Sequence, residues 1–444
     1  MKPGIPRITV RIRDIELIDG GKLMKKPVII LFLILTTALS CTTKYRNIHS
    51  FETVWQTVNQ VHYDPTFGGV DWKAAHEQYK PQIAAAAENK KESFLLINQM
   101  LFELNVSHLL AVYPDDMKRY MPVLFAEGDI GVDVRLLDGE AVITLVRTGT
   151  PAAQAGLHPG LAIERIDGKP VRQIIQEGEA LLIPPFNPRN RLNNLSGYIS
   201  GHIYGPPNTT VKIHFRDKDG KRKETVIHRK SRGRGKVAMD GMPPFYVEFE
   251  AKRLGNNIGY VRFNHWAEPA DTKFIGALAS MRDVRGLIID LRGNPGGFLG
   301  VVHTVTKHLL SEKTLVSSWK FRNRRVDYSF DSNRDAYHGP VVVLIDVRST
   351  SSSEYFAGSM QTINRAVVVG ERSPGYLLIA RWKKLLNGTS FMYAFAQPLM
   401  PDGKVIEGNG VMPDIEVKLD RDALLKGKDS QLEAAVNYIK TKRQ

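Results

Sequence analysis

The chain has 444 residues, of which 43% are hydrophobic and 24% are charged. A usual domain has about 100 to 200 residues, so a chain of this length is expected to contain two or three domains. The composition excludes a disordered chain and a protein with many membrane spans. The formal net charge of +15 raises the question of a nucleic-acid partner. The densest basic run, residues 219–237, has no aromatic residue for stacking on bases. We therefore expect a solvated hairpin and linker there, and no nucleic-acid partner.

Residues 24–41 read "MKKPVIILFLILTTALSC" and are typical of a secretory signal. The apolar run from Val28 to Leu35 is shorter than the about 20 residues that a membrane-spanning helix needs, but it suits the core of a signal peptide. The segment therefore predicts export. Cys41 is the only cysteine, which excludes a disulfide within the chain.

The end of this segment, "LTTALSC", resembles the lipobox of bacterial lipoproteins, although Ala38 stands where that family most often has Leu. The resemblance implies lipidation of Cys41 and a lipid-anchored protein on the periplasmic side of the bacterial cell envelope. The same residues fit an ordinary signal-peptidase site, which would give a secreted protein. Because a signal begins at the N-terminus, Met24 is the expected start and residues 1–23 a mis-assigned extension. The alternative is a structural extension with a strand at "RITVRIRDIEL".

Three regions with different hydrophobic periodicity follow the signal. Residues 46–117 show helical spacing and predict a small helical domain of about three helices. Residues 119–232 contain short β-branched runs separated by turns. Residues 240–422 alternate buried apolar strands with helices, which favours a mainly parallel α/β layer, and residues 423–444 predict a C-terminal helix.

The second region resembles the PDZ domains that are fused to bacterial proteases, through "GTPAAQAGLHPG" and the "GDIGV" loop. Leu161 is its one visible departure, since the family often has Asp there. The resemblance implies that an extended peptide C-terminus pairs with an exposed strand edge and that amides near Gly131 take its carboxylate. Any other small β-barrel is the alternative.

Two turns in the third region each follow a buried strand and precede a helix. In "DLRGNPGGFLG", residues 290–300, Gly296 and Gly297 allow the backbone to approach a ligand closely and to present amides to it. In "DVRSTSSSEYFAGSMQ", residues 346–361, five hydroxyl side chains stand in a row. Such a cluster usually caps a helix, but amides at a helix start also stabilise a nucleophilic serine and the oxyanion that it creates. The local pattern leaves both interpretations open.

Taken together, "IIDLRGNPGG", the serine-rich turn, "RAVVVGE" and "GNGVMPDIEV" resemble the tail-specific, or C-terminal processing, serine proteases and the related tricorn-core proteases. The resemblance spans about residues 50–422. It implies a multidomain α+β chain whose α/β catalytic domain is of the crotonase/ClpP-like kind. In that family the nucleophile lies three residues before the glutamate that opens the helix; this glutamate is Glu354, which makes the nucleophile Ser351. The amides of Gly297 and Ser352 are the candidates for the oxyanion hole.

The general base distinguishes the two branches of this family. The tail-specific branch uses a lysine, but Tyr376 occupies that place here, and a phenol is a poor base at neutral pH. The tricorn-like branch uses a histidine preceded by a serine, together with a late glutamate. "NVSHLL" and "VIEGNG" supply Ser107, His108 and Glu407 at the matching places. The resemblance therefore implies a Ser-His-Ser-Glu site of the tricorn-core kind.

These observations predict an exported serine endopeptidase that forms an acyl-enzyme on Ser351, with no cofactor and no metal ion. Its expected partners are polypeptides, recognised at their C-termini, and the membrane that holds the anchor. Two alternatives stay open. One is a catalytically inactive, peptide-binding envelope protein with the same fold, and the other is a transferase or esterase on the same site.

Overall fold

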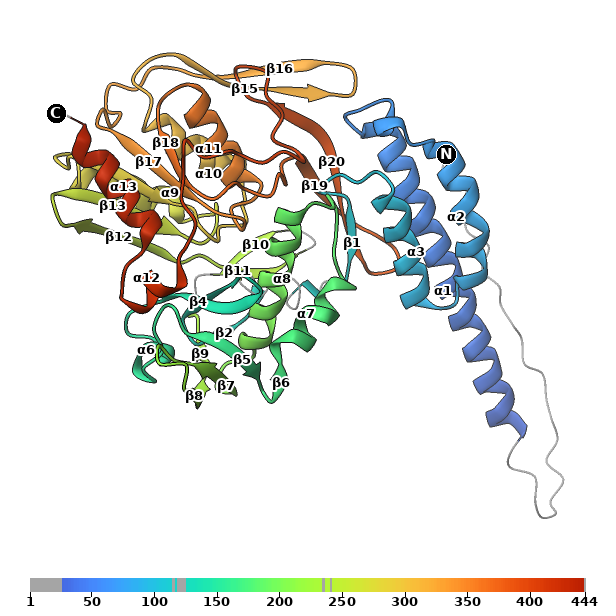
Figure 1. Cartoon of the computed structure of the whole chain (residues 1–444). Coiled ribbons are helices and arrows are strands. Elements are labelled where there is room, and N and C mark those ends of the chain that lie inside the picture. The colour runs from blue at the N-terminus through green and yellow to red at the C-terminus, as the bar shows by residue number, and fades with distance from the viewer. Residues whose placement is uncertain (1–25, 114–115, 118–124, 234–235, 240–241, 443–444) are drawn as a thin grey trace.

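The structure is a computed structural model that describes residues 26–113, 116–117, 125–233, 236–239 and 242–442. The predicted extension at residues 1–23 lies outside the described residues. Helices and sheets gather in separate parts of the molecule (Figure 1), so the expectation of a multidomain chain of mixed helix and sheet is confirmed.

A bundle of three helices forms the N-terminal part, as the helical spacing predicts. Its elements are α1 (Lys26–Val61), a short 3₁₀ turn η1 (Phe67–Gly69), α2 (Trp72–Ala86) and α3 (Lys90–Phe102). Asp71 and Asn89 accept backbone amide hydrogen bonds at the starts of α2 and α3, which fixes where these helices begin. The first turns of α1 stand clear of the rest of the molecule (Figure 1).

A strand directly after the bundle joins it to the C-terminal part of the chain. Strand β1 (Leu110–Val112) pairs antiparallel with β20 (Ser390–Leu399), with Ala111 opposite Phe391. The side chain of Asn98 holds β1 from the helical side, because its amide nitrogen donates to the Ala111 carbonyl at 3.0 Å and its oxygen accepts the Ala111 amide at 2.9 Å. Both backbone groups of Ala111 are therefore satisfied inside the protein.

Residues 128–231 form a β-rich unit around a six-stranded sheet with two helices packed on it. The sheet has the order β3-β4-β5-β7-β8, with β6 beside β5, and a two-stranded ribbon pairs β2 with β9. The unit contains β2 (Gly128–Asp129), β3 (Val132–Leu137), β4 (Glu140–Val146), α6 (Pro151–Gln154), β5 (Ala162–Ile166), β6 (Lys169–Pro170), α7 (Val171–Glu179), α8 (Pro188–Ile203), β7 (Thr210–Arg216), β8 (Arg222–His228) and β9 (Lys230–Ser231). The basic run that begins at residue 219 forms the turn and second strand of the exposed β7–β8 hairpin.

The C-terminal part is built on a six-stranded sheet in the order β12-β13-β14-β17-β18-β21. All its neighbours are parallel except the edge strand β12. The elements are β12 (Phe249–Leu254), β13 (Ile258–Phe263), α9 (Ala270–Ser280), β14 (Gly286–Asp290), α10 (Leu299–Lys307), β17 (Val341–Ile345), α11 (Ser352–Thr362), β18 (Val367–Gly370), β21 (Ile415–Glu416), α12 (Arg421–Leu425) and α13 (Ser430–Thr441). Every residue of β14 and β17 is buried, as expected for strands covered on both faces.

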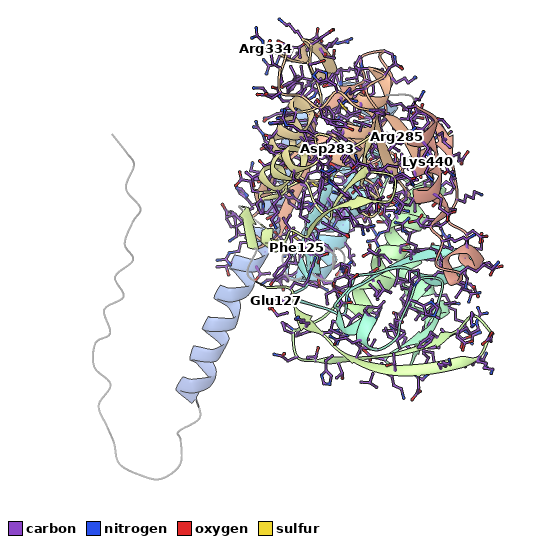
Figure 2. All side chains as sticks on the ribbon, turned by 90° about the vertical axis from the view of Figure 1, so that its left-hand side faces the viewer. Phe125, Glu127, Asp283, Arg285, Arg334 and Lys440 are labelled. Carbon is purple, nitrogen blue, oxygen red and sulfur yellow. The ribbon has the colours of Figure 1, made fainter. Side chains whose placement is uncertain are left out.

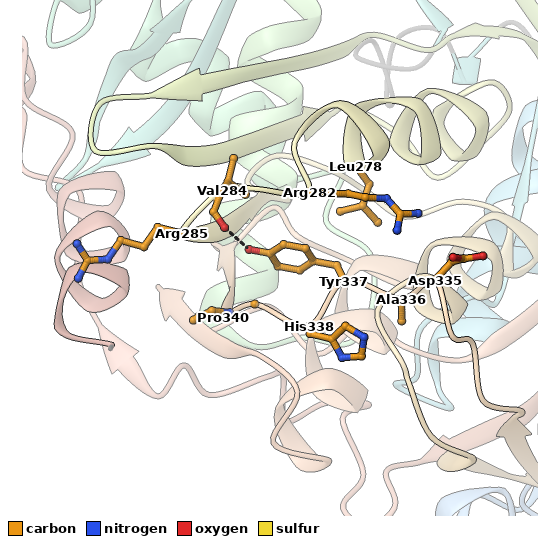
Figure 3. Close-up of a pocket in the computed structure, with 10 residues that line it drawn as sticks. Leu278, Arg282, Val284, Arg285, Asp335, Ala336, Tyr337, His338 and Pro340 are labelled. Carbon is orange, nitrogen blue, oxygen red and sulfur yellow. Dashed lines mark hydrogen bonds between the residues drawn. The ribbon is translucent and has the colours of Figure 1, made fainter. Parts of the chain in front are cut away.

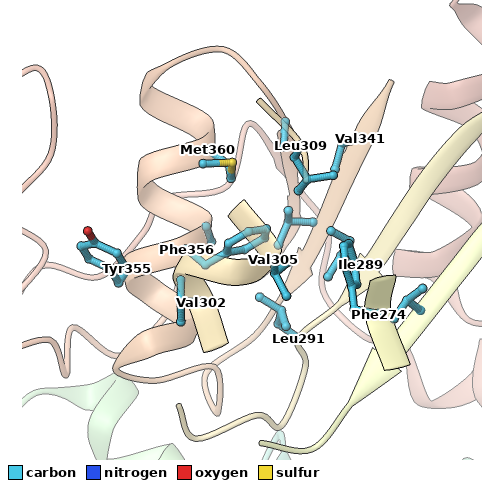
Figure 4. Packing of buried hydrophobic residues seen from close by; sticks show 14 of the residues in the cluster. Phe274, Ile289, Leu291, Val302, Val305, Leu309, Val341, Tyr355, Phe356 and Met360 are labelled. Atoms are coloured by element: carbon cyan, nitrogen blue, oxygen red, sulfur yellow. The ribbon is translucent and has the colours of Figure 1, made fainter. Parts of the chain in front are cut away.

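Helices cover the two faces of this sheet. Alternate strand residues such as Ile289 and Val341 pack with α9, α10 and α11 on one face (Figure 4), whereas Ile288 and Val342 pack with α13 on the other. The C-terminal end of α13 is tied down by Arg285, whose guanidinium donates to the Lys440 carbonyl at 2.7 Å; the two residues lie side by side in Figure 2. The α/β layer predicted from the apolar strands is thus present.

A second sheet was not predicted from the sequence. It has the order β1-β20-β15-β16, with β19 also paired to β20, and adds β15 (Thr314–Phe321), β16 (Arg325–Phe330) and β19 (Ile379–Lys384). A further two-stranded ribbon pairs β10 (Lys236–Met239) with β11 (Met242–Tyr246). The second sheet links the helical bundle to the α/β layer, because β1 comes from the bundle and the other four strands come from the C-terminal part.

Buried ion pairs join the β-rich unit to the α/β layer. Arg135 on β3 pairs with Asp346, which follows β17, and neither side chain is more than 5% exposed. Asp133, also on β3, pairs with Arg262 on β13 at 2.6 Å. Asp346 also accepts the amides of Gly293 and Arg348, so this contact reaches the two turns that were singled out in the sequence.

We expect replacement of Asn98 by Ala to lower the free energy of unfolding by roughly 2 to 4 kcal/mol, because the buried amide and carbonyl of Ala111 would both lose their partner. Urea denaturation would measure this change. Gln82→Ala is a suitable control, since the Gln82 amide makes only an exposed hydrogen bond within α2. Equal stability of the Asn98 and Gln82 variants would contradict the role given to Asn98.

Candidate active site

The serine-rich turn lies directly against the glycine-rich turn, and four of its five hydroxyl groups hold the two together. Each of these four donates to a backbone carbonyl between residues 291 and 297. The bonds are Ser349 to Leu291 (2.8 Å), Thr350 to Pro295 (2.8 Å), Ser352 to Gly297 (2.7 Å) and Ser353 to Asn294 (3.0 Å). The fifth hydroxyl, that of Ser351, instead lies 3.1 Å from Nε2 of His108.

Ser351 has an unusual backbone conformation at the start of α11. Its φ of 55° and ψ of −117° belong to a region that non-glycine residues rarely adopt, at a cost of about 1 to 3 kcal/mol. Its amide is held by two acceptors, the Tyr376 carbonyl at 2.9 Å and the Glu354 carboxylate at 3.0 Å. The surrounding hydrogen bonds thus keep the Ser351 side chain turned toward His108.

His108 and Ser107 come from the N-terminal part, and strand β1 begins two residues later. Oγ of Ser107 lies 2.6 Å from Nδ1 of His108 and donates to the Glu407 carboxylate at 2.8 Å. A hydroxyl has one proton, so Ser107 must accept from His108, which places the imidazole proton on Nδ1. Nε2 of His108 is then an acceptor that faces the Ser351 hydroxyl.

Burial favours the neutral forms of both His108 and Glu407, so it shifts their pKa values in opposite directions. It lowers the pKa of His108 to about 3, so the imidazole is neutral and able to take a proton at neutral pH. It raises the pKa of Glu407 to about 7, against hydrogen bonds from the Ser107 amide, the Ser107 hydroxyl and the Leu377 amide, which favour the carboxylate. The structure thus brings together Ser351, His108, Ser107 and Glu407, which were all named from the sequence.

Glu354 is a site residue whose role the sequence did not reveal. It served there only to locate Ser351. In the structure its fully buried carboxylate accepts from the Ser351, Gly375 and Tyr376 amides and from the Ser373 hydroxyl, at 2.6 to 3.0 Å. Burial raises its pKa to about 7. A glutamate three residues after a helix-capping serine is a sequence signal for a capping box, and that signal was available.

The two glycines predicted to line the site differ in what their amides do. The Gly296 amide donates to the Asn294 side chain at 2.9 Å, which leaves Gly297 as the glycine candidate for an oxyanion hole. A side chain at Gly296 would collide with Ser351, since a Cβ there would lie 2.7 Å from the Ser351 Cβ. The backbone of the glycine turn therefore packs directly on the nucleophile candidate.

Tyr376 lies beside His108, with ring centroids 4.8 Å apart. Burial raises its pKa well above the ordinary value, so the phenol stays protonated and cannot act as a base. Lys383 and Lys384, which follow in the sequence, are exposed residues of β19.

Two predicted residues lie away from this cluster. The Gly131 amide donates to the Asp129 carboxylate at 2.8 Å, and a Cβ at Gly131 would lie 2.3 Å from Thr150. This amide is therefore occupied in the structure. Cys41 falls within helix α1. Over the described ranges, no helix has both the length and the apolarity to span a membrane.

A cavity of about 460 Å³ lies between the end of α9 and the segment that leads into β17 (Figure 3). Tyr337 crosses it and donates to the Val284 carbonyl at 3.3 Å. None of the candidate site residues Ser351, His108, Ser107, Glu407 and Glu354 lines this cavity. Cavity size therefore does not locate the candidate site here, whereas the hydrogen-bond geometry does. Among the side chains that the structure describes, no group of three His, Cys, Asp or Glu could hold a metal ion.

Comparison with known proteins agrees with this geometry. Residues 257–417 match the model of peptidase family S41, and residues 47–102 match the tricorn protease C1 domain. A carboxyl-terminal-processing protease of Synechocystis sp. is 26% identical over 367 residues, which cover 81% of this chain and 78% of that protein.

Two solved structures share the fold. The photosystem II D1 C-terminal processing protease has a TM-score of 0.54 at 19% identity and covers 86% of this chain and 96% of its own. Tricorn protease has a TM-score of 0.51 at 17% identity and covers 89% of this chain and 37% of its own. At these identities the likeness to solved structures shows the fold alone. The family match contains Ser351 and Glu407, and with the relatives it shows that the chain is a serine peptidase with a peptidase family S41 match over residues 257–417.

Proposed function

We propose that the protein is an exported endopeptidase that cleaves polypeptides through an acyl-enzyme on Ser351, with His108 as general base. The 3.1 Å separation of the Ser351 hydroxyl and His108 Nε2 carries this proposal. In the first step Oγ attacks the scissile carbonyl carbon while its proton passes to Nε2. Nε2 then gives this proton to the leaving amine, the C–N bond breaks, and water activated by the same imidazole hydrolyses the ester.

Ser107 and Glu407 act in this proposal as positioning residues. The bonds from His108 Nδ1–H to Ser107 and from Ser107 to Glu407 hold the imidazole in the tautomer that can accept a proton. The Glu407 carboxylate also stabilises the imidazolium that forms after proton transfer. The amides of Gly297 and Ser352 are proposed to bind the oxyanion. Ser352 directly follows Ser351 at the start of α11, and its hydroxyl donates to the Gly297 carbonyl at 2.7 Å, which supports this proposal.

We further propose that the chain divides as the sequence suggests. Residues 46–117 would form the helical domain, 119–232 a PDZ-like domain, 240–422 a crotonase/ClpP-like peptidase domain and 423–444 a C-terminal helical segment. The β-rich unit with its two helices supports the second of these. Capture of a substrate carboxylate at Gly131 would require that Asp129 release the amide, and the Arg147 side chain at 2.5 Å from Asp129 offers the carboxylate another partner.

The proposed location is the bacterial cell envelope, with a signal segment at residues 24–41 and a lipid on Cys41. The sequence of that segment supports this, together with the helix that carries Cys41 away from the body of the molecule (Figure 1). The proposed substrates are polypeptides recognised at their C-termini.

Ser351→Ala should abolish hydrolysis of casein and covalent labelling by a fluorophosphonate probe. His108→Ala should lower kcat by about 10² to 10⁴-fold, the usual contribution of a general base. His308→Ala is the matched control, because Nδ1 of that ring donates to the Thr304 carbonyl at 2.8 Å, at the C-terminal end of α10 and outside the candidate site. Labelling that survives Ser351→Ala would refute the nucleophile, and a wild-type protein without activity or labelling would favour the inactive peptide-binding alternative.

The activity should fall as the pH drops through about 7. Protonation of Glu407, whose pKa is raised to about 7, removes the negative charge that faces the imidazolium, whereas His108 stays neutral down to about pH 3. We expect Glu407→Gln to lower the plateau of kcat/KM about tenfold or more and to weaken this acidic limb. A pH profile of kcat/KM for both proteins would measure this. An unchanged plateau and midpoint in the variant would contradict the role of Glu407.

Glu354→Gln should lower kcat by about 10 to 100-fold with a smaller change in KM, because displacement of the nucleophile by a fraction of an ångström slows the chemical step. The amide group of Gln would face three backbone N–H donors, and we expect Ser351 to leave its position. Rates of fluorophosphonate labelling would report this directly. Glu92→Gln, at the exposed start of α3, is the control that should leave kcat unchanged. Wild-type labelling kinetics in the Glu354 variant would disprove the proposal.

A further inference from the structure

Exposed apolar and basic residues of helix α1 and of the turn between β19 and β20 form one surface. Tyr45 on α1 is 62% exposed and Leu386, in the turn between β19 and β20, is 51% exposed. These two side chains, with Thr42 and Arg46, line one shallow hollow. Exposed apolar side chains that gather from two distant segments are typical of a contact surface. We call this surface, formed by residues 42–46 and 383–386, the basic tip.

The turn that carries Leu386 is held rigidly. The Leu385 side chain is buried in the core of the helical bundle, and the Asn387 amide donates to the Ser50 hydroxyl of α1 at 3.1 Å. The Asn387 side chain accepts from the amide and hydroxyl of Thr389, at 3.1 and 2.7 Å. Leu386 is thus held out into solvent by a turn that is fixed to α1 and to the core of the helical bundle.

The charges on the basic tip all have the same sign. Lys44, Arg46, Lys383 and Lys384 are exposed, and residues 42–51 and 381–390 contain no acidic residue. The neighbouring turn between α2 and α3 contacts α1 through the Asn47 side chain, which donates to the Ala87 carbonyl at 2.8 Å. That turn and the first residues of α3 add two acids and two bases, which balance each other: Glu88, Glu92, Lys90 and Lys91.

We propose that the basic tip rests on the anionic headgroups of a phospholipid bilayer, with Tyr45 and Leu386 entering the boundary between headgroups and acyl chains. The inference rests on the proposed lipid anchor at Cys41. Cys41 lies one helical turn before Tyr45 on α1, so a lipid there would bring the basic tip to the membrane surface. Tyrosine prefers this boundary, and each Lys or Arg near an anionic leaflet strengthens the attraction about fivefold. The tip would supply a second membrane contact beside the lipid and would fix which side of the molecule faces the bilayer.

Photo-crosslinking of the purified full-length chain in vesicles tests this directly. A photoreactive phenylalanine analogue would replace Leu386 in one sample and Val226 in another; Val226 is 57% exposed on β8, in the β-rich unit. With vesicles of phosphatidylcholine and phosphatidylglycerol, we expect lipid adducts at position 386 and several-fold fewer at position 226. Vesicles of phosphatidylcholine alone should give fewer adducts at 386.

Charge reversal separates the contribution of the tip from that of the anchor. Lys383→Glu with Lys384→Glu should lower the yield of lipid adducts at 386 about fivefold or more. Lys426→Glu with Lys428→Glu, two exposed residues in and after the turn that ends α12, is the matched control and should leave that yield unchanged.

Three results would overturn the proposal: equal adduct yields at 386 and 226, no effect of reversing Lys383 and Lys384, or adducts at 386 with a second copy of the chain in place of lipid. If the chain without charge reversal binds vesicles but gives no lipid adducts at 386, the membrane contact of the basic tip is refuted and the anchor is not. If that chain does not bind vesicles at all, the proposed anchor is refuted as well. Fluorophosphonate labelling of Ser351 in the same samples reports on the peptidase site independently of both.

Discussion

The pairing of β1 with β20 is the contact on which the site depends. Three residues of the N-terminal part add one strand to a sheet of the C-terminal part, and His108 lies two residues before that strand. Without this pairing the imidazole would belong to a different part of the molecule from Ser351. Asn98 secures the same strand from the helical side, so the position of His108 is set by backbone hydrogen bonds on both edges of β1. The catalytic arrangement is therefore a property of how two parts of the chain join.

A serine in a strained backbone conformation needs a rigid frame, and the structure supplies one to Ser351 with short polar side chains. Four hydroxyls of the serine-rich turn donate to carbonyls of the glycine-rich turn. The Glu354 carboxylate accepts from the backbone amides of Ser351 and Tyr376. Because these bonds are buried or partly buried, the loss of one would leave a poorly solvated polar group without a partner, which makes the frame resistant to local change. The conformation of Ser351 is thus over-determined by its neighbours, as a residue in a rarely populated backbone region requires.

Burial gives the site its electrostatic character. The same low-polarity surroundings that keep His108 neutral also make the Glu407 and Glu354 carboxylates easier to protonate near neutral pH. A neutral imidazole is a competent base, and a nearby carboxylate favours the imidazolium once the proton has moved.

The sequence by itself determined the kinds of elements and the candidate chemistry. Continuous apolar runs marked β14 and β17, and the order of motifs led through a family resemblance to Ser351, His108, Ser107 and Glu407. Only the tertiary structure showed that the Ser351 hydroxyl lies against the imidazole, that β1 pairs with a strand about 280 residues away, that Glu354 binds the Ser351 amide, and that the Gly131 amide is occupied. Periodicity reports which face of an element is buried, because burial recurs with the local repeat. It carries no information on which distant backbone edge or carboxylate will become the partner, since that choice depends on how whole units pack.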